Sequence, residues 1–256
     1  MLFLKFACIA SFVILLVDAR VSPKGKKEQE TSQHRQKRDG GLSAALIGAA
    51  ISAGSSLVGT TVNGLKQSAY SVAVSGSVTN FAADPLILEF CKLERGHMNE
   101  PLRDIASGQR EGFAGHKTSN TATGNEVLCK YRAGTGAIIY LMYSAPYSFD
   151  FYKNFLSVSI CHPTSSSCQV TDVNFMTSGK RSDLKRVYYQ QRIETLKLCN
   201  MGFCVTGVMG TSHKPEIAWK VYPVKFEDLA TAVQGSAAKD RWDRTDYDRY
   251  VNTVLS

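Results

Sequence analysis

The chain has 256 residues, of which 44% are hydrophobic and 20% charged, enough to build a domain with a sizeable core. Its formal net charge of +8 would suggest a surface that attracts anions. Most of that excess lies in the first 38 residues, however, so the composition gives no support to nucleic-acid binding, which needs clustered basic residues on the working domain.

Residues 1–19 have the pattern of a secretory signal peptide. The segment carries one basic residue, Lys5, before the apolar run FACIASFVILLV, and it ends on VDA, whose small residues suit a signal peptidase. The run is too short, and its flanks are wrong, for a membrane anchor. We therefore expect a secreted protein from which this segment is removed.

Residues 20–38 have the composition of a propeptide. They are hydrophilic, contain no aromatic side chain and end on Arg35, Lys37 and Arg38, the dibasic spacing that processing proteases cut. We expect the mature chain to begin at Asp39. The two removed segments hold eight of the 30 basic and three of the 22 acidic residues, so the mature chain keeps a net charge of +3.

Residues 39–68 are expected to form an amphipathic helix that enters membranes. No charged side chain occurs from Gly40 to Leu65, and apolar residues recur at steps of three and four, which places them on one stripe of a helix. A helix of about 26 residues is roughly 39 Å long, enough to cross a hydrocarbon core of about 30 Å. The alternative is an ordinary helix packed on the core. The residues expected to insert lie along the stripe: Leu46, Ile47, Ile51, Val58 and Val62.

Residues 69–224 have the sequence pattern of a single, mainly β domain. Short runs rich in β-branched and aromatic residues, such as PLILEF and GAIIYLMYSA, are separated by Gly, Pro, Asn and Ser, which predicts a β-sandwich. One helix is expected within it, at SDLKRVYYQQ, with Ser182 as its N-cap and Asp183 in its first turn.

Residues 225–256 differ from the preceding region because they are highly charged. We interpret them as a short C-terminal extension appended to the sandwich. Trp242, Tyr250 and Val251 suggest a short amphipathic helix within it.

Six cysteines remain once Cys8 leaves with the signal, and an even number in an exported chain predicts three disulfides. Spacing suggests two local pairs, each around a turn-like loop, and leaves a third pair by elimination. The candidate pairs are Cys161 with Cys168, Cys199 with Cys204, and Cys91 with Cys129. A zinc site helped by His162 is the alternative, although the spacings match no common zinc finger.

The stretch YSAPYSFDFYKNF, from Tyr143 to Phe155, holds six aromatic rings in thirteen positions. A proline, an aspartate and a lysine among the rings argue against a buried strand and favour a surface loop with exposed rings, which need a partner. The alternative is core packing, because Tyr143, Tyr147 and Phe149 share the parity of one strand face with Phe151.

The run SAPYSFDFYKNFLSVSI resembles the signature of the actinoporins, in which Ser, a small apolar residue, Pro and Tyr lead into an aromatic cluster and then a strand. TATG at residues 121–124, the paired tyrosines of KRSDLKRVYYQ and the closing EIAWKVY also fall where that family has counterparts. The resemblance covers about residues 39–224. Actinoporin-like proteins are secreted pore-forming cytolysins. The resemblance implies a sandwich flanked by two helices, of which the N-terminal one detaches, inserts and lines a cation-permeable pore.

The resemblance also implies a partner, the lipid of a target-cell membrane. The family binds phosphocholine headgroups, preferably those of sphingomyelin, as a monomer that assembles into a homo-oligomer in the membrane. No nucleic-acid partner, cofactor or metal is expected. The implied headgroup site comprises ring- and hydroxyl-bearing residues and one proline: Ser144, Pro146, Phe151, Tyr152, Phe155, Tyr188 and Tyr189.

Several positions depart from the family's pattern and bear on the choice of headgroup. Phe151 and Phe155 stand where the family usually has tryptophan, and Leu156 replaces another. Leu184 stands where a further tyrosine is expected, and Glu126 occupies an apolar position. Phenylalanine lacks the indole N–H and should anchor less well at the headgroup level than tryptophan.

The chemistry of choline explains the need for rings. A trimethylammonium group has no N–H to donate, so it is held against ring faces, at about 0.5 to 2 kcal/mol per ring. We expect Tyr152, Tyr188 and Tyr189 to wall such a cage, with the hydroxyl of Ser144 reaching the phosphate.

Catalysis has little support in the sequence. The histidines His97, His116, His162 and His213 are scattered, without a metalloprotease pair or a nucleophile elbow, and GTG at residues 134–136 lacks the strand-to-helix context of a phosphate loop. We therefore expect no enzyme. The second functional class is a secreted lectin-like binding module on the same sandwich, for which the N-terminal segment would serve only as packing.

Overall fold

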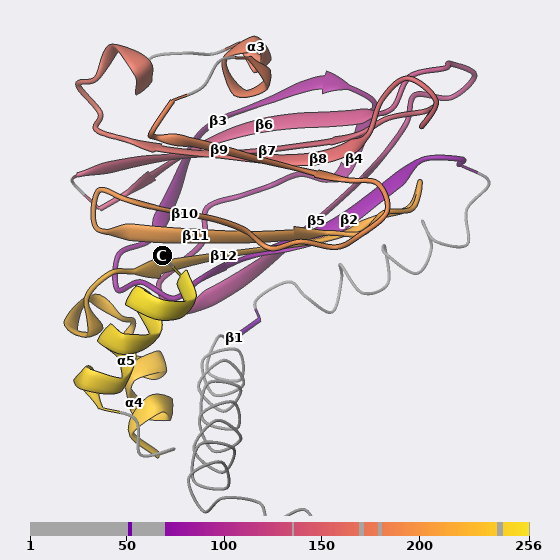
Figure 1. Cartoon of the computed structure of the whole chain (residues 1–256). Coiled ribbons are helices and arrows are strands. Elements are labelled where there is room, and N and C mark those ends of the chain that lie inside the picture. The colour runs from indigo at the N-terminus through magenta and orange to yellow at the C-terminus, as the bar shows by residue number, and fades with distance from the viewer. Residues whose placement is uncertain are drawn as a thin grey trace, which may run out of the picture. The chain divides into compact units, whose positions relative to one another are not determined.

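Two β-sheets form the body of the chain in the computed structural model (Figure 1), which describes residues 51–52, 70–134, 136–168, 172–178, 181–239 and 243–255. The chain divides into two units, Met1–Asp39 and Gly40–Ser256, and every described residue belongs to the second. The expected signal peptide and propeptide lie outside the described residues. The mainly β sandwich expected from the sequence is confirmed.

The first sheet has seven strands within the described part of the chain, in the order β1-β5-β2-β12-β11-β10, with β4 beside β5. Its neighbours pair antiparallel, except that β1 with β5 and β12 with β2 are parallel. The strands are β1 (Ile51–Ser52), β2 (Ala73–Asn80), β4 (His97–Glu100), β5 (Gln109–His116), β10 (Leu196–Asn200), β11 (Phe203–Met209) and β12 (Glu216–Pro223).

The second sheet has five antiparallel strands among the described residues, in the order β3-β6-β7-β8-β9. These are β3 (Leu86–Arg95), β6 (Asn125–Ala133), β7 (Ala137–Ala145), β8 (Asn154–Cys161) and β9 (Leu184–Tyr189). Strand β7 is buried along its whole length, because one face meets the first sheet and the other is covered. The cover consists of the 3-10 helix η1 (Ser166–Cys168) and the short helix α3 (Val173–Thr177), which lies on the side away from the first sheet (Figure 1).

The core between the sheets depends on alternation along the strands. In β6, Val127, Cys129 and Tyr131 are buried toward the first sheet, whereas Glu126 and Lys130 belong to the opposite face. Trp219 of β12 is among the largest fully buried side chains of the described residues. Full burial of an apolar side chain stabilises the folded state by about 1.5–3 kcal/mol relative to leaving it exposed. The outer face of the second sheet carries polar groups such as Glu126 and Lys130, together with the apolar residues that η1 and α3 cover.

The C-terminal extension packs more closely than the appendage expected from its charge. It contains η2 (Phe226–Asp228), α4 (Thr231–Lys239), α5 (Arg244–Tyr250) and the final helical turn η3 (Val251–Leu255). These elements form a second hydrophobic cluster with Phe81 and Tyr222, in which Tyr247 is buried and donates a hydrogen bond to the Pro223 carbonyl at 2.6 Å. Strand β12 thus has its end held by the extension.

The helix expected at residues 182–191 is absent, and that expectation was wrong. Ser182 and Asp183 lie in a turn, and Leu184–Tyr189 form strand β9, which pairs with β8 from Asn154↔Tyr189 to Ser159↔Leu184. An edge position on the sheet satisfies the backbone by pairing, and this tertiary pairing overrides the local cap signal. The helix of this region is α3, which begins after its N-cap Asp172.

Two helices were expected to flank the sandwich, and the N-terminal one, at residues 39–68, lies outside the described residues except at Ile51 and Ser52. Ile51 and Ser52 form β1, parallel to Gln109 and Arg110 of β5, so the helical expectation does not hold at these two positions. The backbone groups of Ile51 pair with a strand here instead of with a helical turn.

Three disulfides join the pairs expected from the sequence. Two are local, Cys161–Cys168 and Cys199–Cys204, and the third, Cys91–Cys129, joins β3 to β6. Each of the six sulfur atoms belongs to one of these disulfides, so the alternative of a zinc site has no thiolate to bind the metal. No group of three or more potential metal-binding side chains gathers among the described residues.

Candidate functional site

A single row of side chains crosses the outer face of the second sheet near one end. The strand register pairs Arg95 with Glu126, Glu126 with Ser144, Ser144 with Phe155, and Phe155 with Tyr188. Residues directly opposite one another on paired strands point to the same face and lie within contact distance. Five strands therefore bring a cation, a carboxylate, a hydroxyl and two rings into one line.

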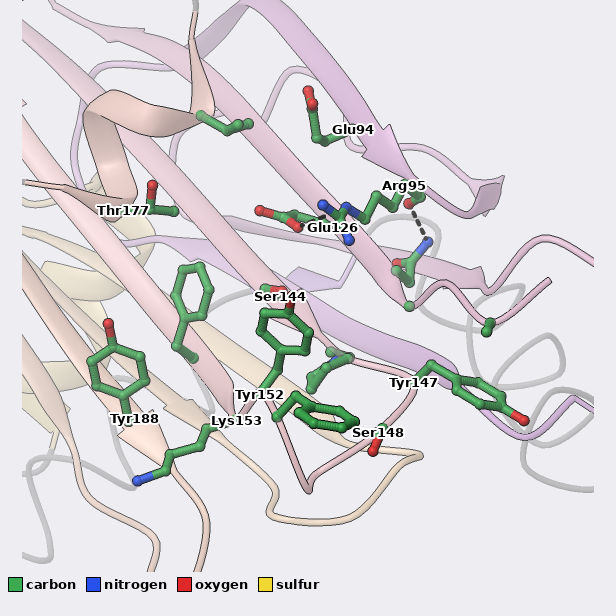
Figure 2. Close-up of a pocket in the computed structure, with 18 of the residues that line it drawn as sticks. Glu94, Arg95, Glu126, Ser144, Tyr147, Ser148, Tyr152, Lys153, Thr177 and Tyr188 are labelled. Carbon is green, nitrogen blue, oxygen red and sulfur yellow. Dashed lines mark hydrogen bonds and ion pairs between the residues drawn. The ribbon is translucent and has the colours of Figure 1, made fainter.

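This row forms the floor of a pocket of about 890 Å³ (Figure 2). The loop from Pro146 to Lys153 lines one side, and Asn174 and Thr177 of α3 line another. Arg95 and Glu126 meet at one end of the pocket, while Tyr188 and Lys153 lie at the other (Figure 2). The volume is within the range of about 300–1,000 Å³ that is typical of small-ligand sites.

The loop that carries the rings is anchored at both ends. At its start, Gly124 lies so close to Pro146 that a Cβ would come within 2.8 Å of the proline Cα. At its end, fully buried Asn154 donates hydrogen bonds to the carbonyls of Gly210 and Ser212 at 3.0 and 2.9 Å. The hydrogen bonds of Asn154 tie the end of the loop to the turn between β11 and β12.

Between the anchors, the loop forms a tight turn. The backbone N–H of Asp150 donates to Ser148 Oγ at 3.2 Å, and that of Tyr152 donates to the Ser148 carbonyl at 3.3 Å. Phe149 turns back and stacks on His213, with ring centroids 3.9 Å apart. Because Phe149 is held in this way, the turn directs the next two rings outward.

The exposed rings form an apolar surface at the mouth of the pocket. Phe151 is 82% exposed, Tyr152 65% and Tyr188 52%. The ring of Tyr188 packs against Phe155, with centroids 5.8 Å apart. Neighbouring exposed rings of this kind are typical of surfaces that contact a partner or a membrane.

The charged end of the pocket is built around Glu126. Its carboxylate lies 3.7 Å from the Arg95 guanidinium, and its side chain is only 14% exposed. Burial raises the pKa of Glu126; nearby Arg95 opposes the shift, Glu94 adds to it, and a hydrogen bond with Ser144 opposes it. The pocket therefore holds an acidic group whose charged form is incompletely solvated.

Most of the site residues expected from the sequence come together. Among the expected headgroup-binding residues, those that line the pocket are Ser144, Pro146, Phe151, Tyr152, Phe155 and Tyr188. The expectation that the stretch is a surface loop needs correction at both ends, because Tyr143 lies in β7 and Phe155 in β8. Tyr143 is buried and donates a hydrogen bond to Asn125 Oδ1 at 2.7 Å.

Tyr189 does not belong to the site, and its assignment there was wrong. The side chain is fully buried, and its hydroxyl donates a hydrogen bond to the Gly207 carbonyl at 3.2 Å. Burial raises the pKa of the phenol. Adjacent residues on a strand point to opposite faces, so Tyr188 on the outer face requires Tyr189 to face the core.

The sequence did not single out Arg95 or the α3 residues Asn174 and Thr177. Arg95 has no local motif, and only the pairing of β3 with β6 brings it beside Glu126. The one signal in the sequence was Glu126 itself, a carboxylate at an apolar position of the resembling family.

The expected membrane-inserting residues Leu46, Ile47, Val58 and Val62 lie outside the described residues, and Ile51 lies in β1. Within the described ranges, no helix combines the length and the apolar character needed to cross a bilayer. The insertion of these five residues into a membrane stays a prediction.

Comparison with known proteins finds relatives among mollusc toxins. No protein-family model matches the chain. It is 36% identical over 115 residues to Tereporin-Ca1 of Terebra anilis (44% of this chain, 60% of that protein) and 27% identical over 200 residues to Tereporin-Ts1 of Terebra subulata (75% and 86%). It is 29% identical over 104 residues to Echotoxin-2 of Monoplex parthenopeus (39% and 38%).

The fold also has a counterpart among solved structures. The lipid-binding protein Nakanori superposes with a TM-score of 0.51 at 13% identity, over 65% of this chain and 79% of that one. At this identity the likeness concerns the fold alone. The chain is thus similar to mollusc toxins named tereporins and echotoxin, and its β-sandwich is similar to that of a lipid-binding protein.

Proposed function

We propose that this protein is a secreted pore-forming cytolysin that docks on lipid headgroups through the pocket and then inserts its N-terminal segment. The observation that carries the proposal is the pocket itself: polar and charged groups on its floor, with Phe151, Tyr152 and Tyr188 exposed at its mouth. A headgroup requires polar partners, and the rings beside it suit the interface between headgroups and acyl chains.

Two further observations support action outside the cell. Three disulfides persist in an oxidising compartment and are rare in a reducing one. The first 38 residues have the pattern of a signal and a propeptide that ends on a basic cleavage site. Both agree with the similarity to toxins.

The inserting part would be residues 39–68. This segment has a run without charged side chains that is long enough, as a helix, to cross a bilayer, and its apolar residues recur at helical spacing. In lipid, unpaired backbone groups are costly, so the membrane favours a helix even for a glycine-bearing sequence. We propose that several copies, monomeric in solution, assemble in the membrane and line a cation-permeable pore with this helix.

Release of dye from vesicles that contain sphingomyelin and cholesterol, by protein cleaved after Arg38, tests the proposal. Cosedimentation with the same vesicles measures docking separately. Phe151→Ala combined with Tyr152→Ala should reduce both, whereas Ile193→Ala, which alters an exposed apolar residue outside the pocket, should reduce neither. Binding of vesicles or glycans without any release would instead favour a lectin-like module.

A further inference from the structure

We propose, as a refinement that rests on the proposed function, that the pocket selects lipid headgroups that end in a primary ammonium, of the phosphoethanolamine type, over those that end in trimethylammonium. Glu126 accepts the ammonium and Arg95 holds the phosphate. These residues occupy one end of the cross-strand row and come from different strands, β6 and β3.

The position of Glu126 fits this role. It lies on the pocket floor between Arg95 and Ser144 in the register, with little exposure to solvent. A carboxylate in such a place is costly unless a cation completes its surroundings. Burial raises the pKa of Glu126 even though Arg95 is adjacent, so the arginine does not fully compensate for the lost hydration. A bound ammonium would supply the missing interaction.

The two classes of headgroup differ in what they offer a carboxylate. A primary ammonium has three N–H donors and makes charge-assisted hydrogen bonds of about 2.7–2.9 Å. A trimethylammonium has none, and its methyl groups keep the charge away from the oxygen atoms. A carboxylate at the pocket floor therefore favours the primary amine, whereas an apolar residue at the same position would favour choline.

The ring side of the pocket is also less suited to choline than the sequence suggested. A cage holds trimethylammonium by ring faces within about 6 Å. Tyr189, the expected third wall, faces the core. The face of Tyr147 is already met by the ammonium of Lys117, 5.5 Å from the ring centroid. Tyr188 and Phe155 pack against each other.

Arg95 and Glu126 place one positive and one negative charge side by side, which matches the two opposite charges of a zwitterionic headgroup. Their separation of 3.7 Å is long for a charge-assisted hydrogen bond, and the Arg95 side chain is 56% exposed at the pocket end. A short ethylene link separates the phosphate from the nitrogen in phosphoethanolamine. Both charges of one headgroup can thus meet adjacent partners, the phosphate at Arg95 and the ammonium at Glu126.

The test compares two vesicle populations that differ only in the headgroup. Each contains equal amounts of cholesterol and either sphingomyelin or ceramide phosphoethanolamine with the same acyl chain. The full chain, expressed with its own leader, should bind the phosphoethanolamine vesicles at least about tenfold more tightly in cosedimentation. Soluble phosphoethanolamine should compete better than soluble phosphocholine, which separates recognition of the headgroup from effects of lipid packing.

The variants assign the preference to single residues. Glu126→Gln keeps the size of the side chain but removes its charge, and it should abolish the preference. Arg95→Gln should weaken binding to both vesicles alike, because both lipids carry a phosphate. Glu89→Gln is the matched control: Glu89 also pairs with basic residues, Lys130 and Arg132, but does not line the pocket, so the preference should survive.

The outcomes separate this inference from the proposed function. Equal or tighter binding to sphingomyelin, or a preference that survives in Glu126→Gln, would overturn the inference and leave the cytolysin proposal intact. Failure to bind either vesicle would overturn both, whereas selective binding without permeabilisation would overturn the cytolysin proposal alone. Circular dichroism on each variant verifies that a loss of binding does not reflect a loss of fold.

Discussion

Tyr188 and Tyr189 are adjacent in the chain but lie on opposite faces of β9, the first 52% exposed at the pocket and the second fully buried. Replacing each by alanine should therefore have opposite consequences. Tyr188→Ala should weaken vesicle binding and lower the free energy of unfolding by only about 0.5–1.5 kcal/mol, through the loss of its ring contact with Phe155. Tyr189→Ala should lower that free energy by about 3–5 kcal/mol, because it opens a cavity in the core. Urea denaturation beside cosedimentation measures both, and equal stability losses would contradict this placement.

The anchor at Asn154 should link stability to the shape of the loop. Asn154→Ala removes two hydrogen bonds and leaves the carbonyls of Gly210 and Ser212 without these donors, which should cost about 1–3 kcal/mol of unfolding free energy. The freed loop should be cut faster by protease near Phe151 and should bind vesicles less well. Unchanged proteolysis would mean that the other contacts of the loop suffice to hold it.

The raised pKa of Glu126 predicts a pH-dependent stability difference. An acid whose pKa is higher in the folded than in the unfolded protein favours folding at low pH, and this contribution is lost as the pH rises through the folded-state pKa. Glu126→Gln should therefore be more thermostable than the wild type at neutral pH, with the gap closing as the solution becomes acidic. Thermal unfolding from pH 3 to pH 8 measures the gap; a variant that is less stable than the wild type at neutral pH, with the difference vanishing in acid, would show that the Arg95 interaction dominates.

Docking and pore formation should separate in the N-terminal segment. Val58→Asp places a charge on the apolar stripe, at an insertion cost of about 2.5–3.5 kcal/mol near the middle of the membrane. Dye release should fall while cosedimentation persists, because the pocket belongs to another part of the chain. Ser56→Asp, outside the expected apolar stripe, is the control. Full release by Val58→Asp would indicate that the segment is a packed structural element.

The propeptide should restrain activity until it is removed. Residues 20–38 carry seven basic and two acidic residues, and charges near mid-bilayer cost a few kcal/mol each. Precursor and cleaved protein are compared in the same dye-release assay, with a variant in which Lys37 and Arg38 are replaced by glutamine to block processing. Equal release by the two forms would exclude restraint.

The sequence alone determined the features that depend on local pattern. The spacing of short β-branched runs predicted the sandwich, and the cysteine spacings predicted the two local disulfides and left the third pair by elimination. The aromatic stretch located Phe151 and Tyr152, which are exposed at the pocket mouth. These signals can be read from the sequence because the residues of a strand, of a close cysteine pair or of a turn containing proline are near one another in the chain.

The tertiary structure decided what depends on strand pairing. The cap-like Ser182 suggested a helix, but pairing with β8 made the following residues a strand and turned Tyr189 into the core. The meeting of Arg95 with Glu126 likewise has no local signal, since it follows from the register of β3 on β6. Side chains along a strand alternate between faces, so a single register sets which groups share the pocket, and that register is a property of the folded sheets.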